Sequence, residues 1–350
     1  MKNYLGNSKN HAEDVSTINQ HTLNRSISSE GTHKHAKSYL GTIGSSGVVG
    51  SGTILKFGGM ALKHDNIDLS KLRLKKKLKS NMRHEYYKYR WHNEDVTVKK
   101  ILCNERMLSK NTREVLPKIS RAFDQEYLKL RIFSNEFIEP VLGIVNSPTN
   151  ISVVYSYQTR SLKSQLYPID DAEILEGFAS AEQAFKWALH VCNGLTFLHS
   201  LNEVDQLYGL QLSSDSIFID SNNTAKINLG DTLFSFERSK DNAQNFYPGY
   251  SAPEVLSKSE KQYKIQPAHM WSFACILWEI QHREQPFYGL THMEIGIKVA
   301  FENLRLEMDN DTNAHIAQLF KICYSDEPGK RPKFVQILEV LEKFIVSIEV

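Results

Sequence analysis

A basic segment is the most obvious place where this sequence could bind a charged group. Residues 71–100 hold eleven lysines and arginines against three acidic residues, a local charge of +8. The segment is either a patch for phosphate groups or the solvated face of lysine-bearing strands, and we favour the solvated face. The whole chain carries a net charge of only +2, so it generates no field that would gather nucleic acid or a membrane surface. We therefore expect no nucleic-acid partner.

The cysteines and the apolar residues point to no metal, disulfide or membrane chemistry. Four cysteines are scattered without a C-x-x-C pair, at positions 103, 192, 275 and 323, which argues against a zinc site or a secreted disulfide framework. We expect reduced thiols in the core of a cytosolic protein. No run of about 18 apolar residues could span a bilayer, and the first residues lack the apolar stretch of a signal peptide.

The elements that must position any site begin only after a polar N-terminal segment. Residues 1–63 are rich in Asn, Ser, Thr, His and Gly, and the stretch GTIGSSGVVGSG at 41–52 is typical of a flexible linker. We predict that residues 1–63 are disordered. The remaining chain, 64–346, has the composition of one folded domain.

The folded part divides into a β-rich portion and a helical portion. VTVKKIL at 96–102 alternates as a strand does, and residues 121–134 have apolar side chains at helical spacing. Beyond about residue 161 the pattern is helical, and the helix predicted at 269–280 is apolar nearly all round, which indicates burial on every side. We predict an α+β fold with a β-rich N-terminal lobe and a larger helical C-terminal lobe.

Three ordered motifs in the helical portion resemble those of protein kinases. Ala252-Pro253-Glu254 resembles the A-P-E that ends an activation segment. Trp271-Ser-Phe-Ala resembles the central helix of the large lobe, and Lys330-Arg331-Pro332 resembles a late arginine motif. The resemblance implies a bilobal protein kinase fold in which Glu254 and Arg331 form a buried structural ion pair.

The same resemblance assigns the parts of a phosphoryl-transfer site. Lys99 in V-T-V-K matches the strand lysine, with Glu126 as its expected partner, and Asp231 stands at the D-F-G position, where it would hold Mg²⁺. The base is missing, because Gln211 stands where the catalytic aspartate should be and an amide cannot accept the substrate proton. Ser216 replaces the metal-binding asparagine, although its hydroxyl could still offer one oxygen.

Two further losses weaken catalysis. The stretch LKSNMRHEYYKYRW at 78–91, which aligns with the glycine-rich loop, contains no glycine. His269 replaces the aspartate that anchors the catalytic loop. This pattern favours a pseudokinase that retains ATP as a structural ligand. The alternative is an active serine/threonine kinase of the tyrosine-kinase-like group with an atypical catalytic loop.

Longer stretches outside the motifs resemble the integrin-linked kinase family, from residue 67 to about 346. The most specific runs are Leu130–Ser134, Phe234–Phe236, Met270–Ala274, Met293–Val299 and Lys330–Phe334. The resemblance implies a scaffold at the cytoplasmic face of integrin adhesions that binds ATP–Mg²⁺. The residues it assigns to the cofactor are Lys99, Asp231, Asn81, Tyr157 and Ser216, with Asp231 on the metal.

The resemblance also implies the partners. A parvin-like calponin-homology protein would dock on the large lobe, with links to kindlin and to integrin β tails. Residues 1–66 show no ankyrin repeat period, so we do not expect ankyrin-dependent binding of a PINCH-type LIM protein by this chain.

The helix predicted at 292–304 supports a docking role independently of the resemblance. Met293, Ile297, Phe301 and Leu304 form an apolar stripe, and Ile295 and Val299 lie on the opposite side. A helix that is apolar on two faces can bury one face on its own domain and offer the second to a partner, with Lys298 at the rim. The alternative is a helix that is buried on both faces.

Overall fold

A computed structural model describes most of residues 66–348 and two short strands before them. The described residues are 56–57, 60–61, 66–81, 83–102, 112–130, 133–147, 150–167, 178–201, 207–237, 247–257 and 263–348. Most of the segment predicted to be disordered, 1–63, lies outside them. Within that segment two short strands pair with each other, β1 (Lys56–Phe57) and β2 (Met60–Ala61).

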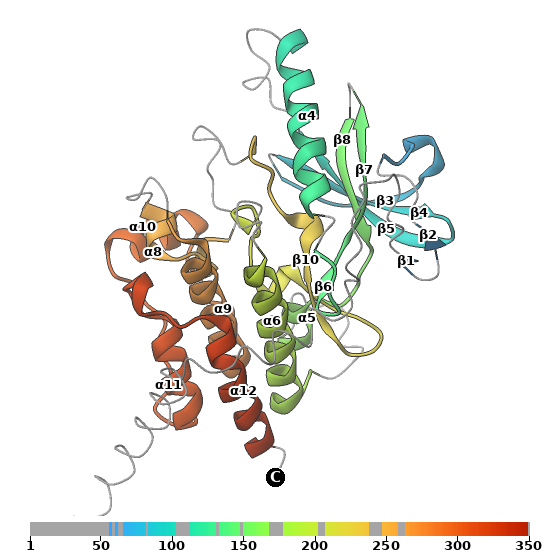
Figure 1. Ribbon diagram of the computed structural model, residues 1–350. Coiled ribbons are helices and arrows are strands. Elements are labelled where there is room, and N and C mark those ends of the chain that lie inside the picture. Colours follow the sequence, from blue (N-terminus) through green and yellow to red (C-terminus); the bar gives the residue numbers. More distant parts are fainter. Residues whose placement is uncertain are drawn as a thin grey trace, which may run out of the picture. The chain divides into compact units, whose positions relative to one another are not determined.

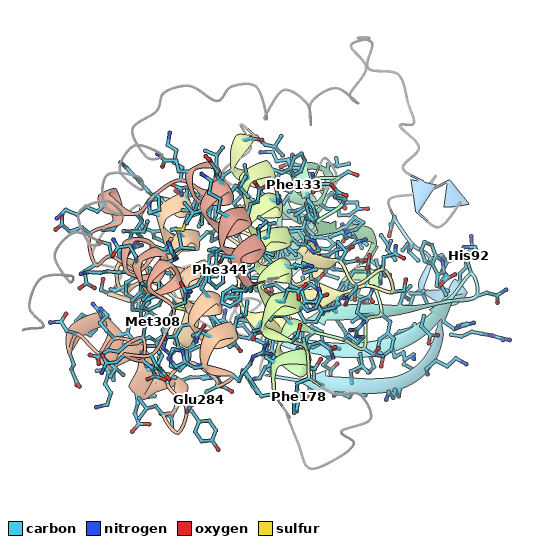
Figure 2. The ribbon with its side chains drawn as sticks, turned by 90° about the horizontal axis from the view of Figure 1, so that it is seen from below. His92, Phe133, Phe178, Glu284, Met308 and Phe344 are labelled. Carbon is cyan, nitrogen blue, oxygen red and sulfur yellow. The ribbon has the colours of Figure 1, made fainter. Side chains whose placement is uncertain are left out.

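The N-terminal lobe is an antiparallel five-stranded sheet in the order β3-β4-β5-β8-β7 (Figure 1). Its strands are β3 (Arg73–Ser80), β4 (His84–Trp91), β5 (Glu94–Ile101), β7 (Val141–Ser147) and β8 (Asn150–Ser156). The tight turn between β4 and β5 uses two residues with positive φ, His92 at 45° and Asn93 at 65°. Figure 2 labels His92 at the tip of this hairpin.

The lysine-rich strand is a solvated edge, as the sequence analysis favoured. Every residue of β3 is exposed, and β3 pairs on one side only, with β4. Exposed lysines on an edge strand discourage pairing with a second sheet. The central strand β5, in contrast, is buried from Val96 to Lys99.

One helix, α4 (Thr112–Leu130), packs against β7 of the sheet. The side chains predicted at helical spacing are all buried: Phe123, Tyr127, Leu130 and Phe133. The helix ends at Leu130, four residues before the predicted end, and Phe133 reaches the core from the segment that follows. A short 3-10 turn, η2 (Leu69–Lys71), precedes β3.

The C-terminal lobe is helical, so the predicted α+β, bilobal fold is confirmed. Its α-helices are α5 (Leu162–Leu166), α6 (Ala181–Ser200), α8 (Pro253–Ser257), α9 (Ile265–His282), α10 (His292–Phe301), α11 (Ala314–Cys323) and α12 (Phe334–Ile348). Short 3-10 turns lie between them: η3 (Ser214–Ser216), η4 (Leu229–Asp231), η6 (Pro248–Tyr250) and η7 (Pro328–Lys330). Of the helices in the described ranges, none is long and apolar enough to cross a membrane.

Helix α9 forms the centre of this lobe, as its all-round apolar pattern predicts. All its residues from Pro267 to Ile280 are buried, and it contacts α6 and α11. Helix α12 packs on α6, where Phe344 meets Phe185 edge to face with ring centroids 4.9 Å apart. Figure 2 labels Phe344 at this packed layer.

A second, three-stranded sheet carries the chain into the candidate site. Its order is β6-β10-β9, formed by β6 (Ile138–Glu139), β9 (Ile217–Ile219) and β10 (Ala225–Asn228). The hairpin turns at Asn223, whose φ is 63°. Strand β10 runs directly into η4, so the pairing of these three strands fixes where Asp231 stands.

The predicted ion pair between Glu254 and Arg331 is present. The Arg331 guanidinium donates to both Glu254 oxygens, at 2.7 and 3.0 Å, and also to the carbonyl of Pro267. Its side chain is fully buried and stacks over the Trp271 ring at 5.0 Å. This pair ties α8, at the end of the activation segment, to the segment before α12.

Breaking this pair by Arg331→Ala leaves the Glu254 carboxylate, whose side chain is only 10% exposed, without its cation, so we expect a loss of about 3–5 kcal/mol of unfolding free energy. Urea unfolding followed by circular dichroism measures it. Lys343→Ala is the matched control, because Lys343 pairs with Glu339 at 2.7 Å but both side chains are more than 60% exposed; that change should cost under about 1 kcal/mol. Equal losses in the two variants would contradict a buried, stability-determining pair.

Candidate functional site

Lys99, on the central strand β5, is buried and bound to the segment that follows β10. Its Nζ donates to the Thr232 carbonyl at 3.1 Å and lies 3.4 Å from Asp231 Oδ1. The side chain has no solvent exposure. A buried ammonium needs such partners, because its desolvation is costly otherwise. The two groups that the sequence assigned to phosphate and metal are therefore brought together, and they bind each other.

Asp231 has a second partner, which the sequence analysis missed. The Tyr86 hydroxyl, from β4, donates to Asp231 Oδ1 at 2.7 Å. Burial opposes ionisation of Asp231, but Lys99, Lys79 and this hydroxyl hold its pKa below the usual value. Asp231 is thus an ionised carboxylate whose charge is already balanced from within the protein.

A second buried carboxylate lies next to this group. His84 Nε2 and Glu237 Oε1 are 2.5 Å apart, and Glu237 Oε2 accepts from the Phe234 backbone N–H at 2.9 Å. Burial and the nearby Lys99 lower the pKa of His84, while Lys99 and His84 keep the pKa of Glu237 low against the effect of burial. A neutral His84 therefore donates to an ionised Glu237. The sequence signal that could have revealed this contact is a glutamate directly after the aromatic residues of FSFE, at 234–237.

The predicted pairing of Lys99 with Glu126 is wrong. Glu126, on α4, instead accepts from the Ser235 backbone N–H at 2.8 Å and from the Ser235 hydroxyl. The carboxylate of Glu126 thus caps the segment after Asp231, while Lys99 is neutralised by Asp231 itself. Helix α4 therefore still contacts the segment that follows Asp231, but through hydrogen bonds to the uncharged Ser235.

The catalytic-loop segment has no free base or metal ligand among its described residues. Gln211 lines the cavity beside Asp231, as its alignment predicts. Asp215 lies 3.5 Å from Lys163 of α5 and does not line that cavity. The Ser216 hydroxyl accepts from the Ser213 N–H at 2.9 Å and donates to the Ser213 carbonyl at 2.8 Å. The Ser216 oxygen thus closes the η3 turn, and its assignment to the cofactor stays a prediction.

Two histidines replace the usual anchor of this loop. His269 Nδ1, on α9, lies 3.1 Å from His199 Nε2, on α6. Burial lowers the pKa of His269 to about 3 and that of His199 to about 4. Both rings are therefore neutral at physiological pH, and one donates its N–H to the other. The helices α6 and α9 are joined here by a neutral hydrogen bond.

The loop is held instead by a buried glutamate that the sequence analysis did not single out. Glu279 of α9 accepts from the hydroxyls of Ser214 at 2.6 Å and Tyr250 at 2.9 Å, and also from Tyr167. Burial raises the pKa of Glu279 to about 7, against the effect of these hydrogen bonds. A carboxylate inside the all-apolar helix 269–280 was the signal for such a network.

The remaining residues assigned to the cofactor divide between the cavity and its surroundings. Asn81 lines the cavity, with its side-chain oxygen accepting from the backbone N–H groups of Arg83 and His84 at 2.9 and 2.8 Å. Tyr157 is not among the lining residues, and Lys88 lies 3.9 Å above its ring. Asn81 shapes the β3–β4 turn, and Tyr157 packs against the sheet.

The cavity at these residues does not fit ATP–Mg²⁺. Its volume is about 140 Å³, and it is lined by Lys79, Ser80, Asn81, His84, Tyr86, Gln211, Asp231, Leu233 and Tyr247. Sites for cofactors and drug-sized ligands usually occupy roughly 300–1,000 Å³. In the described part of the chain no cluster of three or more His, Cys, Asp or Glu side chains could hold a metal ion. In this conformation we derive no step through a nucleotide.

Helix α10 presents the second apolar face that its sequence predicts. Ile295 and Val299 are buried against the lobe, whereas Met293, Ile297 and Phe301 are 75%, 48% and 68% exposed. Lys298 lies at the edge of this stripe, 3.4 Å from Glu302. The alternative of a helix buried on both faces is thereby excluded. Leu304, predicted in the same stripe, instead lies after the end of α10 and packs partly buried against the core. We call Met293, Ile297 and Phe301 the α10 stripe.

Comparisons with known proteins agree with this geometry. The protein tyrosine and serine/threonine kinase family matches residues 72–341. Human scaffold protein ILK is 36% identical over 288 residues, which cover 81% of this chain and 60% of that protein. The integrin-linked protein kinase homolog pat-4 of Caenorhabditis elegans is 34% identical over 285 residues, 81% of this chain and 57% of that protein.

One of the more distant relatives is named as a serine/threonine-protein kinase. Serine/threonine-protein kinase CTR1 of Arabidopsis thaliana is 27% identical over 299 residues, which are 82% of this chain and 34% of that protein. The chain spans about three fifths of the length of the two integrin-linked relatives. The identity of these two relatives to this chain, 34% and 36%, is higher than that of CTR1.

The Glu279 network predicts a pH-dependent stability. A carboxyl group whose pKa is raised on folding stabilises the protein below the unfolded pKa of 4.5, and this contribution is lost as pH rises toward about 7. Relative to Glu279→Gln, the wild type should therefore gain up to about 3 kcal/mol of unfolding free energy between pH 7.5 and pH 4.5.

Chemical denaturation at several pH values measures this difference. The exposed Glu339 provides the control, because the wild type and Glu339→Gln should differ by nearly the same amount at each pH. A pH-independent difference for Glu279→Gln would show that Glu279 titrates normally. The pH dependence of the wild-type unfolding free energy does not isolate Glu279. The lowered pKa values of His199 and His269 also change that free energy in the same pH range.

Proposed function

The chain belongs to the protein tyrosine and serine/threonine kinase family, with an integrin-linked-kinase-like sequence, and from this premise we propose that it is a pseudokinase scaffold. It would act at the cytoplasmic face of integrin adhesions, by binding partners rather than by transferring phosphate. Two of its relatives carry names that fit this role, scaffold protein ILK and an integrin-linked protein kinase homolog.

One observation carries the proposal: the position of the catalytic base holds an amide, Gln211, and among the described residues no nearby carboxylate takes over its role. The two candidates are already engaged, Asp231 by Tyr86 and Lys99, and Asp215 by Lys163. Loss of a general base removes typically 10²–10⁴-fold in rate. The displaced Ser216 hydroxyl supports the same conclusion, because a second metal would lack its ligand.

The α10 stripe is the partner surface in this proposal. Three exposed apolar side chains at intervals of four residues are what a helix offers to an apolar groove. Methionine adapts its shape to such a groove, and Lys298 at the edge would contribute specificity. The integrin-linked resemblance supplies the partner, a parvin-like calponin-homology domain. Kindlin and an integrin β tail are further partners proposed on the resemblance alone.

Binding of ATP–Mg²⁺ is implied by the family resemblance and is untested, and the residues of the site argue both for it and against it. Lys99 and Asp231 support it, since both are the residue types that hold phosphate and metal in this family. The small cavity, the glycine-free loop and the Ser216 contact oppose it. The scaffold role does not depend on it, because the α10 stripe lies outside the cavity.

The alternative function is an active serine/threonine kinase with an atypical catalytic loop. The retained Lys99 and Asp231 favour it, as does the similarity to kinases such as CTR1. It would require a base supplied by Asp215 or by the substrate. Asp215 would have to leave Lys163 and enter the cavity for this chemistry.

We expect no phosphate transfer by the purified protein. With radiolabelled ATP, Mg²⁺ and a general protein substrate, the wild type should label the substrate no more than Lys99→Met does, because both lack a base. Gln211→Asp, which restores the carboxylate, should leave partner capture unchanged. Labelling by the wild type that disappears in Lys99→Met would favour the kinase alternative.

The partner surface is tested by the double variant Met293→Ala/Phe301→Ala. It should weaken capture of a purified parvin-like calponin-homology domain at least tenfold, because central apolar anchors carry most of an interface's energy. Its melting temperature should stay near the wild-type value, since both side chains are exposed. Val346→Ala on α12 is the matched control, an apolar side chain that is 60% exposed away from the α10 stripe. Undiminished capture by the double variant would contradict this surface.

A further inference from the structure

Tyr86 lines the cavity of the candidate nucleotide site, beside Lys99 and Asp231. On the sheet, Tyr86 of β4 stands directly opposite Lys99 of β5. Residues directly opposite on antiparallel strands project from the same face. Both side chains reach Asp231, and Tyr86 is only 4% exposed. A tyrosine therefore fills the space beside the strand lysine.

The Tyr86 hydroxyl uses the oxygen that a metal would need. It donates to Asp231 Oδ1 at 2.7 Å, and Lys99 Nζ is 3.4 Å from the same oxygen. Burial and the charge of Asp231 raise the pKa of Tyr86 well above its usual value, so the hydroxyl keeps its proton and stays a donor. A hydrogen bond from a neutral hydroxyl to an ionised carboxylate is among the stronger kinds.

The Tyr86 ring is held from its neighbours as well. Lys79 Nζ, from the edge strand β3, lies 4.5 Å from the ring centroid, a cation–π distance. The His84 ring packs edge to face at 6.0 Å, and His84 is itself fixed by Glu237. Tyr86 is therefore anchored through its hydroxyl and through its ring.

The backbone next to Asp231 is closed by another tyrosine. A side chain at Gly230 would place its Cβ 2.1 Å from the Tyr155 ring, so only glycine fits between this backbone and Tyr155. Tyr155 is 4% exposed. On the far side, Tyr247 lines the cavity with Tyr86. The 140 Å³ that remain are far less than a nucleoside triphosphate requires.

We propose that Tyr86 is an internal ligand that occupies the nucleotide site of this pseudokinase and excludes ATP–Mg²⁺. Its hydroxyl replaces the metal on Asp231, and its ring takes space that the nucleotide would fill. The site is thus satisfied without any bound ligand. The inference deepens the proposed function and rests on the assignment of this cavity as the kinase-type nucleotide site.

The experiment measures nucleotide binding by the full chain, with and without Tyr86. A fluorescent ATP analogue with Mg²⁺ is titrated into the wild type, Tyr86→Leu and Tyr87→Leu, and melting temperatures are recorded with and without ATP–Mg²⁺. Tyr87 is the matched control, because it is the next residue on β4 and its hydroxyl donates to Glu85, away from Asp231. We expect Tyr86→Leu to bind at least 30-fold more tightly than the wild type and Tyr87→Leu.

The wild type and Tyr87→Leu should show no rise in melting temperature at 1 mM ATP–Mg²⁺, whereas Tyr86→Leu should show one that Asp231→Ala abolishes. Binding by the wild type as tight as by Tyr86→Leu overturns the proposal. No binding by either also overturns it, because something other than Tyr86 then excludes the nucleotide.

A second variant, which keeps the aromatic ring, tests the proposal even where Tyr86→Leu fails to fold. Tyr86→Phe removes only the hydroxyl, and we expect it to bind the analogue at least tenfold more tightly than the wild type; unchanged binding overturns the proposal. None of these substitutions touches the α10 stripe. Partner capture therefore reports on the scaffold function separately from nucleotide binding.

Discussion

The buried ammonium of Lys99 is the constraint on which the rest of the site depends. A cation without solvent exposure must be neutralised within reach of its four-carbon stem, and here Asp231 and the Thr232 carbonyl do so. In an active kinase the same pair is divided between phosphates and a metal. In this protein the pair closes on itself, with the Tyr86 hydroxyl as its third member. These contacts fix the segment 231–237 at both ends, because Lys99 holds the Asp231 carboxylate and His84 holds the Glu237 carboxylate.

Buried ionisable groups in the helical lobe are stabilised in two different ways. Arg331 and Glu254 form a fully hydrogen-bonded ion pair, which is stable because each group satisfies the other. Glu279 has no cation and instead takes three hydroxyl donors, so burial raises its pKa. Both arrangements fix loops to α9, and neither places a free carboxylate where phosphate would be transferred. Both sets of contacts hold the lobe together without contributing a carboxylate to phosphate transfer.

A lobe held together by such contacts is well suited to a binding function. The α10 stripe projects from a helix whose inner face is buried, so its position follows from the packing of the lobe and needs no bound ligand. An internally satisfied nucleotide site would make that surface independent of nucleotide concentration. Catalysis, in contrast, requires a pocket that opens to admit substrate and release product.

The sequence by itself determined the fold, the two faces of α10 and the Glu254–Arg331 pair. These follow from local identity and spacing: apolar periodicity places side chains on helix faces, and ordered motifs identify a known architecture. The loss of the base was equally readable, because Gln211 cannot become a carboxylate in any packing. Only the tertiary structure decided which groups neutralise Lys99, where the Ser216 oxygen points and what fills the cavity. Those contacts join residues that are far apart in the chain, such as Tyr86 and Asp231, and their geometry depends on how strands and turns pack rather than on any local pattern. For the same reason the predicted Lys99–Glu126 pair was wrong: both residue types were present, but Ser235 lay closer to Glu126 and Asp231 closer to Lys99.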